Sequence, residues 1–545
     1  MRVLGIEGTA WCASAALYDE TTDETVIESD AYEPESGGIH PREAAEHMHE
    51  AIPTVVGIVL DHARETHDGD GRPVDAVAFS QGPGLGPCLR TVGTAARALA
   101  QTLDVPLVGV NHMVAHLEVG RHRSGFDSPV CLNASGANAH LLGYRNGRYR
   151  VLGETMDTGV GNAIDKFTRH VGWSHPGGPK VEAHAESGEF VDLPYVVKGM
   201  DFSFSGIMSA AKQAYDDGNS VEDVCFGLQE HIFAMLTEVA ERALSLTGSD
   251  ELVLGGGVGQ NARLREMLET MCEERGASFY APEPRFLRDN AGMIALLGAK
   301  MVRAGDTTEI ADSAVDPNYR PDQVAVTWRD ADEDVHVSPG AGETVRGAEA
   351  VVSFEDDRVE KRRIPKAYRH PALDETLRRD RTVLEARLTS QARREGVPTP
   401  VVRDLDPAES TIVFEFVGDL DLRENCTEAG VRDVGRHLAV IHDAGFVHGD
   451  PTTRNVRVES RTASDEPSAD EPGRTYLIDF GLGYHTDHVE DYAMDLHVFD
   501  QSLVGTADDP DPLRDAFRAA YREASSQADA VLGRLHDVEG RGRYQ

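Results

Sequence analysis

The sequence predicts an α/β protein built from two parts, an N-terminal domain over residues 1–325 and a smaller α+β domain over residues 343–545. Three observations support this prediction. Strand-like and helix-like apolar runs alternate along residues 1–303. A polar, acidic segment rich in proline and glycine interrupts the pattern at residues 304–345. A further set of apolar runs follows, so we place the linker between the two domains at residues 326–342.

The first half of the N-terminal domain opens on a strand, RVLGIEGT, with SAALY as the partner strand of a hairpin. A helix follows, because REAAEHMHEAIPTVVGIVLDHA has apolar residues at spacings of three and four. The strand VDAVAFS then enters a glycine-rich turn, QGPGLG. The helix LRTVGTAARALAQTL and the strand VPLVGVNH complete this half.

The second half also opens on a β-hairpin, which starts at SPVCLNASG and turns at Asn146-Gly147. It contains the helical run VCFGLQEHIFAMLTEVAERAL and ends with a strand, a glycine turn and a helix in ELVLGGGVGQNARLREML. Two α/β halves of this kind indicate a two-lobed domain of the actin/hexokinase/Hsp70 type, in which nucleotides bind between the halves.

The charge composition predicts a protein adapted to concentrated salt. The net charge is −40, and only seven of the 53 basic residues are lysines. Acidic, lysine-poor surfaces stay hydrated where salt screens their self-repulsion. We therefore expect a halophilic archaeon as the source; the alternative is a merely acidic protein. Where lysine is this scarce, each remaining one is a candidate for function, Lys361 first.

Several classes of protein are disfavoured by composition. No stretch reaches the roughly 18–20 uncharged apolar residues of a membrane helix. The N-terminus MRVLGIEGT lacks the apolar region of a signal peptide. The six cysteines are scattered and form no CxxC pair, which favours reduced thiols and disfavours a zinc ribbon. We expect a cytoplasmic protein.

The first candidate site is the pair His112 and His116, which follows the strand VPLVGVN. Histidines four residues apart share one face of a helix, so both can reach one metal ion. The pair is not the HExxH motif of metalloproteases, because no glutamate lies between the two histidines. The alternative is two histidines on a helix surface.

Three glycine turns indicate a ligand site in the same domain. They lie at residues 82–87, 177–179 and 254–261, each beside a predicted strand or helix start. Glycine allows backbone N–H groups to approach a phosphate or ribose closely. Any one of them is compatible with an ordinary tight turn, but three together, with Asp165 and Glu182 nearby in sequence, favour a binding site.

The smaller domain carries HGDPTTRN at residues 448–455 and IDFG at residues 478–481. In protein kinases, an Asp and an Asn at this spacing followed by Asp-Phe-Gly form the catalytic centre. We expect Asp450 to orient a hydroxyl or a water, and Asn455 and Asp479 to bind magnesium. Lys361 is then the phosphate-pairing lysine and Glu385 its partner. The acidic stretch 459–474 is predicted to be a solvated insertion between two strands.

The phosphate loop of this domain is reduced. Kinases use GxGxxG, whereas this sequence has Gly347-Ala-Glu-Ala. About 65 residues follow the Asp-Phe-Gly and no APE-type segment is present, which leaves little room for a peptide substrate. We therefore favour ATP hydrolysis, or phosphorylation of a bound partner, over general protein phosphorylation. These features predict a small atypical protein-kinase-like α+β domain.

Residues 1–325 resemble a known family. The order GIEGT, GPGLG, NHMVAH, SGAN, GNAIDKF, HPGGPKVE, DFSFSG, LGGGVGQN and RDNAGMIA is similar to the catalytic subunit of the KEOPS complex, the tRNA adenosine threonylcarbamoyltransferase once described as a glycoprotease. The resemblance implies a metal site formed by His112, His116 and Asp289. It also implies that threonylcarbamoyl-AMP binds to Asn133, Ala134, Ser135, Gly136, Ala137, Asp165, Gly178, Glu182 and Asn261. The family often has a tyrosine, sometimes a metal ligand, in place of Asn133, and SGGN in place of SGAN.

Residues 340–545 resemble the small kinase of the same complex, through KAYRHPALD, LRRDRTVLEARL, HGDPTTRN and DFGLG. Natural fusions of the two proteins occur in archaea, and the whole sequence resembles such a fusion. The basic tail GRGRY at residues 540–544 is either a frayed terminus or, as the resemblance implies, a contact for tRNA phosphates.

We therefore expect a bifunctional tRNA-modification protein that transfers a threonylcarbamoyl group to the adenosine next to the anticodon. The expected cofactors are one divalent metal, iron or zinc, in the first domain and ATP with magnesium in the second. The expected partners are tRNA, threonylcarbamoyl-AMP and the other KEOPS subunits. Two alternatives stay open at this point: a metalloprotease fused to a kinase, and a scaffold that binds nucleotide without catalysis.

Overall fold

The computed structural model describes residues 1–32, 40–67, 71–136, 138–145, 147–329, 344–355, 357–459, 474–507 and 509–539. These residues form two compact units, the first within Met1–Val196 and Phe202–Val337, the second within Val197–Asp201 and Ser338–Arg541. Ala137, Asn146, most of the expected linker and the GRGRY tail lie outside the described residues. The boundaries at 325 and 343 therefore stay predictions.

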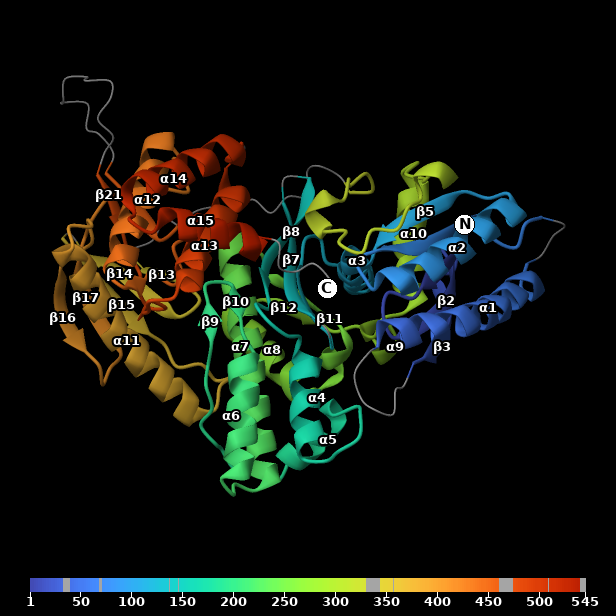
Figure 1. Ribbon diagram of the computed structural model, residues 1–545, viewed down its shortest axis with the longest axis horizontal. Helices are drawn as coiled ribbons and strands as arrows, with labels where there is room; N and C mark the ends of the chain where they lie inside the picture. The colour runs from blue at the N-terminus through green and yellow to red at the C-terminus, as the bar shows by residue number, and fades with distance from the viewer. Residues whose placement is uncertain are drawn as a thin grey trace. The chain divides into compact units, whose positions relative to one another are not determined.

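The first unit contains two five-stranded sheets with the same topology (Figure 1). In the first sheet the order is β3-β2-β1-β4-β5; in the second it is β12-β11-β6-β7-β8. In both, the first three strands along the chain pair antiparallel and the last two add parallel strands. The bounds are Arg2–Glu7 (β1), Cys12–Asp19 (β2), Glu24–Ala31 (β3), Ala76–Gly82 (β4), Leu107–Asn111 (β5), Val130–Ala134 (β6), Ala139–Arg145 (β7), Arg148–Glu154 (β8), Glu251–Gly255 (β11) and Ser278–Tyr280 (β12). The predicted two α/β halves, each opening on a hairpin, are confirmed.

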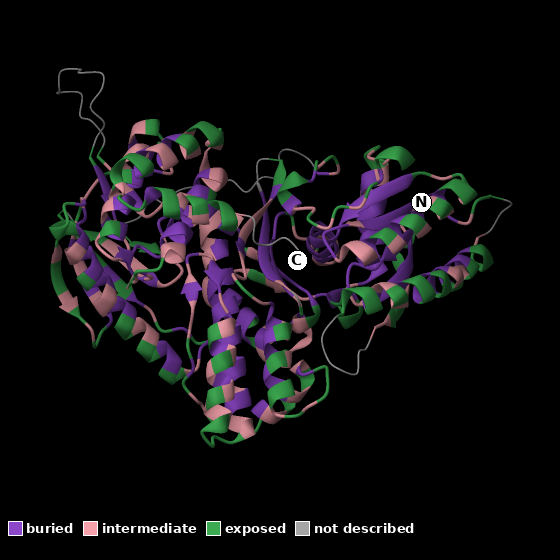
Figure 2. Ribbon diagram, in the orientation of Figure 1, coloured by how far each residue is buried: buried purple, intermediate pink, exposed green. Residues whose placement is uncertain are grey.

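Alternating side chains of the first sheet build two cores. Leu4 and Ile6 face the helices α1 and α2, whereas Val3 faces α3 and α10. The central strands of both sheets are buried (Figure 2). The helices are α1 (Pro41–Glu65), α2 (Gly86–Leu103), α3 (His112–Ser124), α4 (Val160–His170), α5 (Gly178–Ala185), α6 (Ser205–Asp216), α7 (Val221–Thr247), α8 (Ala262–Arg275), α9 (Pro284–Leu287) and α10 (Ala291–Arg303). Helix α3 packs on β5 from one half and on β6 and β11 from the other, so it lies where the halves meet.

Residues 304–329 pack onto the first unit despite their polar composition. The Asn111 amide donates to the carbonyl of Tyr319, at 2.9 Å. The Arg329 guanidinium lies 3.7 Å from the centre of the Tyr144 ring, and Trp328 stacks on Tyr149. Arginine and tryptophan side chains carry large apolar surfaces that pack well against aromatic rings, a property that the polar composition of the segment does not reveal.

The second unit begins with an antiparallel sheet in the order β13-β14-β15-β17-β16. Helix α11 (Pro371–Arg394) connects β15 to β16, and a mostly helical part follows. The strands are Thr344–Arg346 (β13), Ala350–Glu355 (β14), Arg358–Arg363 (β15), Val402–Asp406 (β16) and Thr411–Glu415 (β17); the helices are Glu428–Asp443 (α12), Val489–Thr506 (α13), Pro510–Ala524 (α14) and Ala528–Glu539 (α15). This arrangement agrees with the predicted α+β domain.

The helical part of this unit also contains short paired strands. Residues Val456–Val458 (β20) pair antiparallel with Thr475–Leu477 (β21), and residues 460–473, which are not described, connect them. The prediction that the acidic insertion joins two strands is therefore confirmed. The other short strands here are Leu420–Asp421 (β18), Phe446–Val447 (β19) and Tyr484–His485 (β22). Val197–Lys198 (β9) and Asp201–Phe202 (β10) form a separate two-stranded sheet. Among the helices that the structure describes, each is too short or too polar to cross a membrane.

Candidate functional site

The two histidines lie at the start of α3, immediately after β5. Asn111 caps the helix, since its side-chain oxygen accepts from the N–H groups of Met113 and Val114 at 3.0 and 3.1 Å. This cap ends the strand and begins the helix within one residue. His112 and His116 are consequently one turn apart and on the same side of α3, as the spacing predicts.

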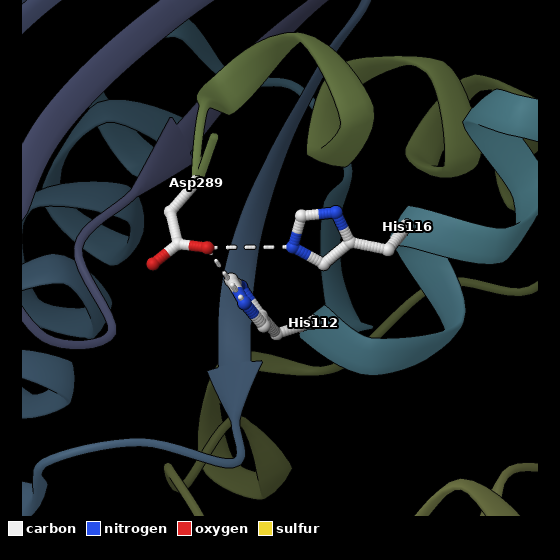
Figure 3. Close-up of side chains that lie close together, drawn as sticks. All are labelled: His112, His116 and Asp289. Carbon is white, nitrogen blue, oxygen red and sulfur yellow. Dashed lines mark hydrogen bonds and ion pairs between the residues drawn. The ribbon is translucent and has the colours of Figure 1, made fainter. Parts of the chain in front are cut away.

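Asp289, at the N-terminal side of α10, completes a cluster with these histidines (Figure 3). Its Oδ1 lies 3.4 Å from His112 Nε2 and 3.3 Å from His116 Nε2. The two imidazole rings meet edge to face, with centres 4.9 Å apart. Although burial alone would raise the pKa of Asp289, the two histidines hold it well below its usual range. Two imidazole nitrogens and one carboxylate oxygen within 4.8 Å form a donor set that suits a divalent metal.

Glu7 is a member of this site that sequence analysis missed. It is fully buried, and its Oε2 lies 3.1 Å from His112 Nδ1 while Oε1 accepts from the Thr9 N–H at 2.8 Å. Burial opposes a proton on His112, yet Glu7 and Asp289 raise the pKa of that imidazole to about 10. A carboxylate inside the apolar strand RVLGIE was the available signal. Such a carboxylate–imidazole pair orients a metal ligand.

The other oxygen of Asp289 is also held. The Trp11 indole N–H donates to Asp289 Oδ2 at 3.0 Å. Asp289 therefore presents one oxygen to the histidines and keeps the second bonded to the protein. The Asp289 side chain is therefore held from both sides.

Asn133 lies at the end of β6, beside the histidine cluster. Its Nδ2 donates to His140 Nε2 at 3.4 Å, and its Oδ1 is buried without a protein partner. A Cβ atom on Gly255 would lie 3.4 Å from that oxygen and 3.6 Å from His116 Cβ. Burial, with smaller contributions from the charges of His116 and His112, lowers the pKa of His140 to about 3. His140, which sequence analysis also missed, is therefore neutral.

The remaining predicted adenylate-binding residues that the structure describes, which exclude Ala137, lie along a border of elements linked by hydrogen bonds. Ser135 bonds to the Asn138 carbonyl, and the Gly136 carbonyl accepts from Asn162 N–H at 2.9 Å, which ties the end of β6 to α4. Asp165 Oδ1 accepts from the Gly177 N–H at 2.8 Å, next to Gly178.

The same border continues to helix α8. Glu182 Oε1 accepts from the Ala262 N–H at 2.7 Å. Asn261 caps α8 through its side-chain oxygen. The structure thus joins Asp165 to the residue before Gly178, and Glu182 to the residue after Asn261.

Each of the three turns needs glycine, because a neighbouring atom lies too close to the backbone for a Cβ atom to fit. At Gly256, with φ of +83°, a Cβ would lie 2.2 Å from the Ala134 carbonyl oxygen; at Gly177 it would lie 2.2 Å from Thr168 Oγ1. At Gly84 it would lie 2.7 Å from the Thr9 carbonyl oxygen. The glycines let the turns pack against the elements that carry Glu7, Asn133 and Asp165.

In the second unit, Lys361, Glu385 and Asp479 come together. Lys361 Nζ lies 3.0 Å from Glu385 Oε1 and 2.6 Å from Asp479 Oδ1. Although burial opposes it, the charges of Lys361 and Arg363 lower the pKa of Asp479 to about 2. Asp479 has φ of +65°, an unfavourable conformation for a residue with a side chain, which is frequent at functional sites.

Asp450 and Asn455 form a second group in this unit. Asn455 Nδ2 donates to the carbonyl oxygen of Asp450 at 2.8 Å and to its Oδ2 at 3.2 Å. The Ile478 N–H donates to the Asn455 carbonyl, which connects this loop to the segment bearing Asp479. Gly347 lies in the turn between β13 and β14, where its N–H donates to the Ala350 carbonyl.

Asp495, on α13, holds the loop that carries Asp450. Its two oxygens accept from the N–H groups of His448 and Gly449 at 2.6 and 2.8 Å. His442 Nε2 also lies 3.1 Å from Asp495 Oδ2. Sequence analysis missed this residue, although an aspartate inside the largely apolar helix YAMDLHVF was a usable signal.

Comparisons with known proteins show the family of this chain. The family described as tRNA N6-adenosine threonylcarbamoyltransferase matches residues 20–296. A protein of Haloarcula marismortui is 71% identical over the full length of both chains, and its name is "Probable bifunctional tRNA threonylcarbamoyladenosine biosynthesis protein". This chain belongs to the tRNA N6-adenosine threonylcarbamoyltransferase family.

Other members of the bifunctional threonylcarbamoyladenosine biosynthesis family also span the whole chain. The protein of Halobacterium salinarum is 71% identical and covers 100% of this chain and 99% of its own length. That of Methanospirillum hungatei is 51% identical, with 99% of both chains covered. Because the family's members extend across both units, both belong to the bifunctional protein, and the predicted fusion is confirmed.

Proposed function

We propose that the first unit transfers the threonylcarbamoyl group from threonylcarbamoyl-AMP to N6 of the adenosine next to the anticodon, in tRNAs that read codons beginning with adenine. The observation that supports this most directly is the buried cluster of His112, His116 and Asp289 in a chain of the threonylcarbamoyltransferase family. The cluster suits one divalent metal, iron or zinc, which would supply Lewis-acid chemistry to an acyl transfer.

The reaction needs positioning more than activation. The substrate is a mixed anhydride, which is already activated. The adenosine nitrogen attacks the carbamoyl carbon and forms a C–N bond, while the bond from that carbon to the phosphate oxygen breaks. AMP leaves with the electron pair of the broken bond, and one N6 proton is released. Glu7 and Trp11 hold the ligand side chains in place. The buried oxygen of Asn133 offers an acceptor beside them. Fixing reactants in this way is worth several kcal/mol of barrier.

We further propose that the adenylate is bound along the border made by residues 133–137, Asp165, Gly178, Glu182 and Asn261. In support, this border runs from the end of β6, next to the histidines, to the N-termini of α5 and α8. The dipoles of these two helices give their N-termini a positive field, which favours a phosphate.

The transfer is tested with purified chain, synthetic threonylcarbamoyl-AMP and unmodified tRNA at high salt. Nucleoside mass spectrometry should detect threonylcarbamoyladenosine, and His112→Ala and His116→Ala should abolish it while ATP hydrolysis continues. Full modification by the double histidine variant would contradict the assignment. Casein cleavage by the metal-loaded chain would instead favour a metalloprotease, a function disfavoured because residues 113–115 contain no glutamate.

We propose that the second unit binds ATP with magnesium and hydrolyses it, or phosphorylates a bound partner, to support the transfer within the KEOPS complex. Lys361 would pair with the phosphates, Asp479 and Asn455 would hold magnesium, and Asp450 would orient the attacking hydroxyl or water. In support, only residues 482–488 separate Gly481 from α13, too few for an activation segment and a peptide-binding platform. Asp450→Ala and Asp479→Ala should remove ATP hydrolysis and leave the transfer chemistry of the first unit measurable.

A further inference from the structure

Arg363 lies two residues after Lys361 on β15, and neither sequence motif includes it. Side chains two residues apart on a strand point to the same face, so Arg363 and Lys361 are neighbours. Its side chain is 2% exposed. An arginine this deeply buried needs several partners, and those partners belong to three different parts of the candidate ATP site.

The first partner is Glu385 on α11. Arg363 Nη2 lies 2.6 Å from Glu385 Oε2, whereas Lys361 Nζ lies 3.0 Å from Glu385 Oε1. Each oxygen of this carboxylate, which is 1% exposed, therefore faces its own cation. Arg363 Nη1 also donates to Thr382 Oγ1, one turn earlier on α11, at 3.1 Å.

The second partner is the turn between β13 and β14, at residues 347–349. Arg363 Nε lies 3.9 Å from Glu349 Oε2, and Arg381 Nη1 on α11 lies 2.6 Å from Glu349 Oε1. The Glu349 carbonyl accepts from the Ile364 N–H at 3.2 Å, and Lys366 Nζ donates to the Ala348 carbonyl. The Glu349 side chain is consequently tied to β15 and α11, and the backbone of the turn is tied to the segment that follows β15.

The third partner is the segment that carries Asp479. A Cβ atom at Gly481 would lie 2.4 Å from Arg363 Nη2 and 3.5 Å from Glu385 Oε2. Glycine at this position lets the guanidinium pack directly against the backbone after Asp479. Arg363 thus contacts three parts of the unit: the turn at residues 347–349, helix α11 and the backbone that follows Asp479.

The charged groups around Arg363 are balanced in number. Three carboxylates, on Glu349, Glu385 and Asp479, face three cations, on Lys361, Arg363 and Arg381. If Lys361 paired with nucleotide phosphates, the Asp479 carboxylate would become available for magnesium. Arg363 would still pair with Glu385 through the second oxygen of that carboxylate.

We propose that Arg363 is a positioning residue. It holds Glu385 and the turn at residues 347–349 in place, so that the ATP site is assembled without movement of α11. In protein kinases the Lys–Glu pair is the element that activation-segment phosphorylation controls. Here seven residues separate Gly481 from α13, and releasing Glu385 would require separating it from two buried cations together. The inference rests on the proposed ATP-binding function.

The test uses the full-length chain at high salt and measures nucleotide affinity with a fluorescent ADP analogue, ATPase kcat and KM, and thermal unfolding. The variants are Arg363→Met, Arg363→Lys, Glu349→Gln and the double variant Arg363→Met with Glu385→Gln. Arg378→Met is the matched control, because Arg378 pairs with Asp374 on the same helix at 2.7 Å, away from Glu385.

We expect Arg363→Met to lower kcat by roughly 10- to 100-fold, the effect of a small displacement of a charged group. Arg363→Lys, which can reach Glu385 but not also Thr382 and Glu349, should recover part of this loss. Adding Arg363→Met to Glu385→Gln should cause little further loss, because the two residues act as one unit. Arg378→Met should match the wild type.

The outcomes separate the two proposals. A wild-type chain that neither binds nor hydrolyses nucleotide overturns the proposed ATPase function itself. If the wild type is active and Arg363→Met keeps its kcat and KM, only the positioning role fails. Additive losses in the double variant would also refute it. Should Arg363→Met not fold, Arg363→Lys and Glu349→Gln decide, because wild-type kinetics in both would overturn the inference.

Discussion

At the residue scale, the two candidate sites share one arrangement. His112 lies between Glu7 and Asp289, and Lys361 lies between Glu385 and Asp479. In each case the group that would meet a ligand is buried and held by two carboxylates from distant parts of the chain. Side chains fixed in this way are pre-organised, so ligand binding does not have to order them.

Glu7→Gln should weaken metal binding without removing a ligand. Neutral glutamine cannot hold the His112 Nδ1 proton as a carboxylate does, and loss of such a partner typically lowers metal affinity about 10- to 100-fold. Metal content after dialysis against a graded chelator measures this. The control is Glu46→Gln, an exposed carboxylate on α1 that pairs with Arg42. Equal metal retention in both variants would contradict the role of Glu7.

Lys361→Arg should remove most ATP hydrolysis although the charge is kept. A planar guanidinium cannot replace a compact ammonium that contacts Glu385 and Asp479 at 3.0 and 2.6 Å. Loss of one charged hydrogen bond, about 1.5–3 kcal/mol, corresponds to about 10- to 150-fold in rate. Steady-state turnover at saturating ATP checks it, with Lys180→Arg, which bonds Ser174 in the first unit, as control. Unchanged turnover would refute the phosphate-pairing role.

At the element scale, α3 is anchored at Glu118, two residues after His116. Glu118 is fully buried, and its oxygens lie 2.7 Å from Lys300 Nζ on α10 and 2.7 Å from the Tyr149 hydroxyl on β8. Although burial opposes it, Lys300 and Arg121 lower the pKa of Glu118 to about 2. This network ties the helix that carries His112 and His116 to the element that begins after Asp289.

Glu118→Gln should destabilise the first unit by up to about 3–5 kcal/mol at neutral pH, because it removes the buried charge that pairs with Lys300, Arg121 and Arg329. The pKa of Glu118 is lower in the folded than in the unfolded chain, so its stabilisation is present above the unfolded pKa of about 4.5 and is lost as pH falls toward 2. Chemical denaturation at several pH values measures the difference between variant and wild type.

That difference should shrink between about pH 4.5 and pH 2, the window between the unfolded and the folded pKa of Glu118. Glu266→Gln, which removes an exposed carboxylate on α8, should be neutral throughout. A pH-independent difference for Glu118→Gln would show that the carboxylate is not charged in the folded protein.

At the scale of the whole molecule, a net charge of −40 opposes binding of tRNA, itself a polyanion. The Debye length falls from about 10 Å at 0.1 M salt to about 3 Å at 1 M, so global repulsion fades while short contacts persist. Binding must then depend on local arginines, shape and partner subunits. A protein with this surface is expected to fold and act only where screening is strong.

We expect weak tRNA binding by the isolated chain at every salt concentration, with affinity raised by the other KEOPS subunits. Titrations at about 0.1, 1 and 3 M KCl, spanning the screening range, with and without partners, measure this, and folding and transfer activity are followed in parallel. Tight binding by the lone chain in low salt, with activity intact, would overturn both the salt adaptation and the dependence on partners.

The sequence by itself determined the features that depend on local spacing. The repeated hairpin and glycine turns identified two α/β halves, HxxxH placed two imidazoles on one helical face, and the Asp-Asn and Asp-Phe-Gly motifs marked the second site. These signals are local because helix and strand periodicity act over a few residues.

Only the tertiary structure decided which distant residues support those motifs. Glu7 joins His112 across 105 positions, Asp495 reaches Gly449 across 46, and Arg363 reaches Glu385 across 22. Residues 304–329 had the composition of a linker and nevertheless pack on the first unit. A buried charge is stable only where partners from other elements converge on it, and that convergence has no period or spacing along the chain from which it could be predicted.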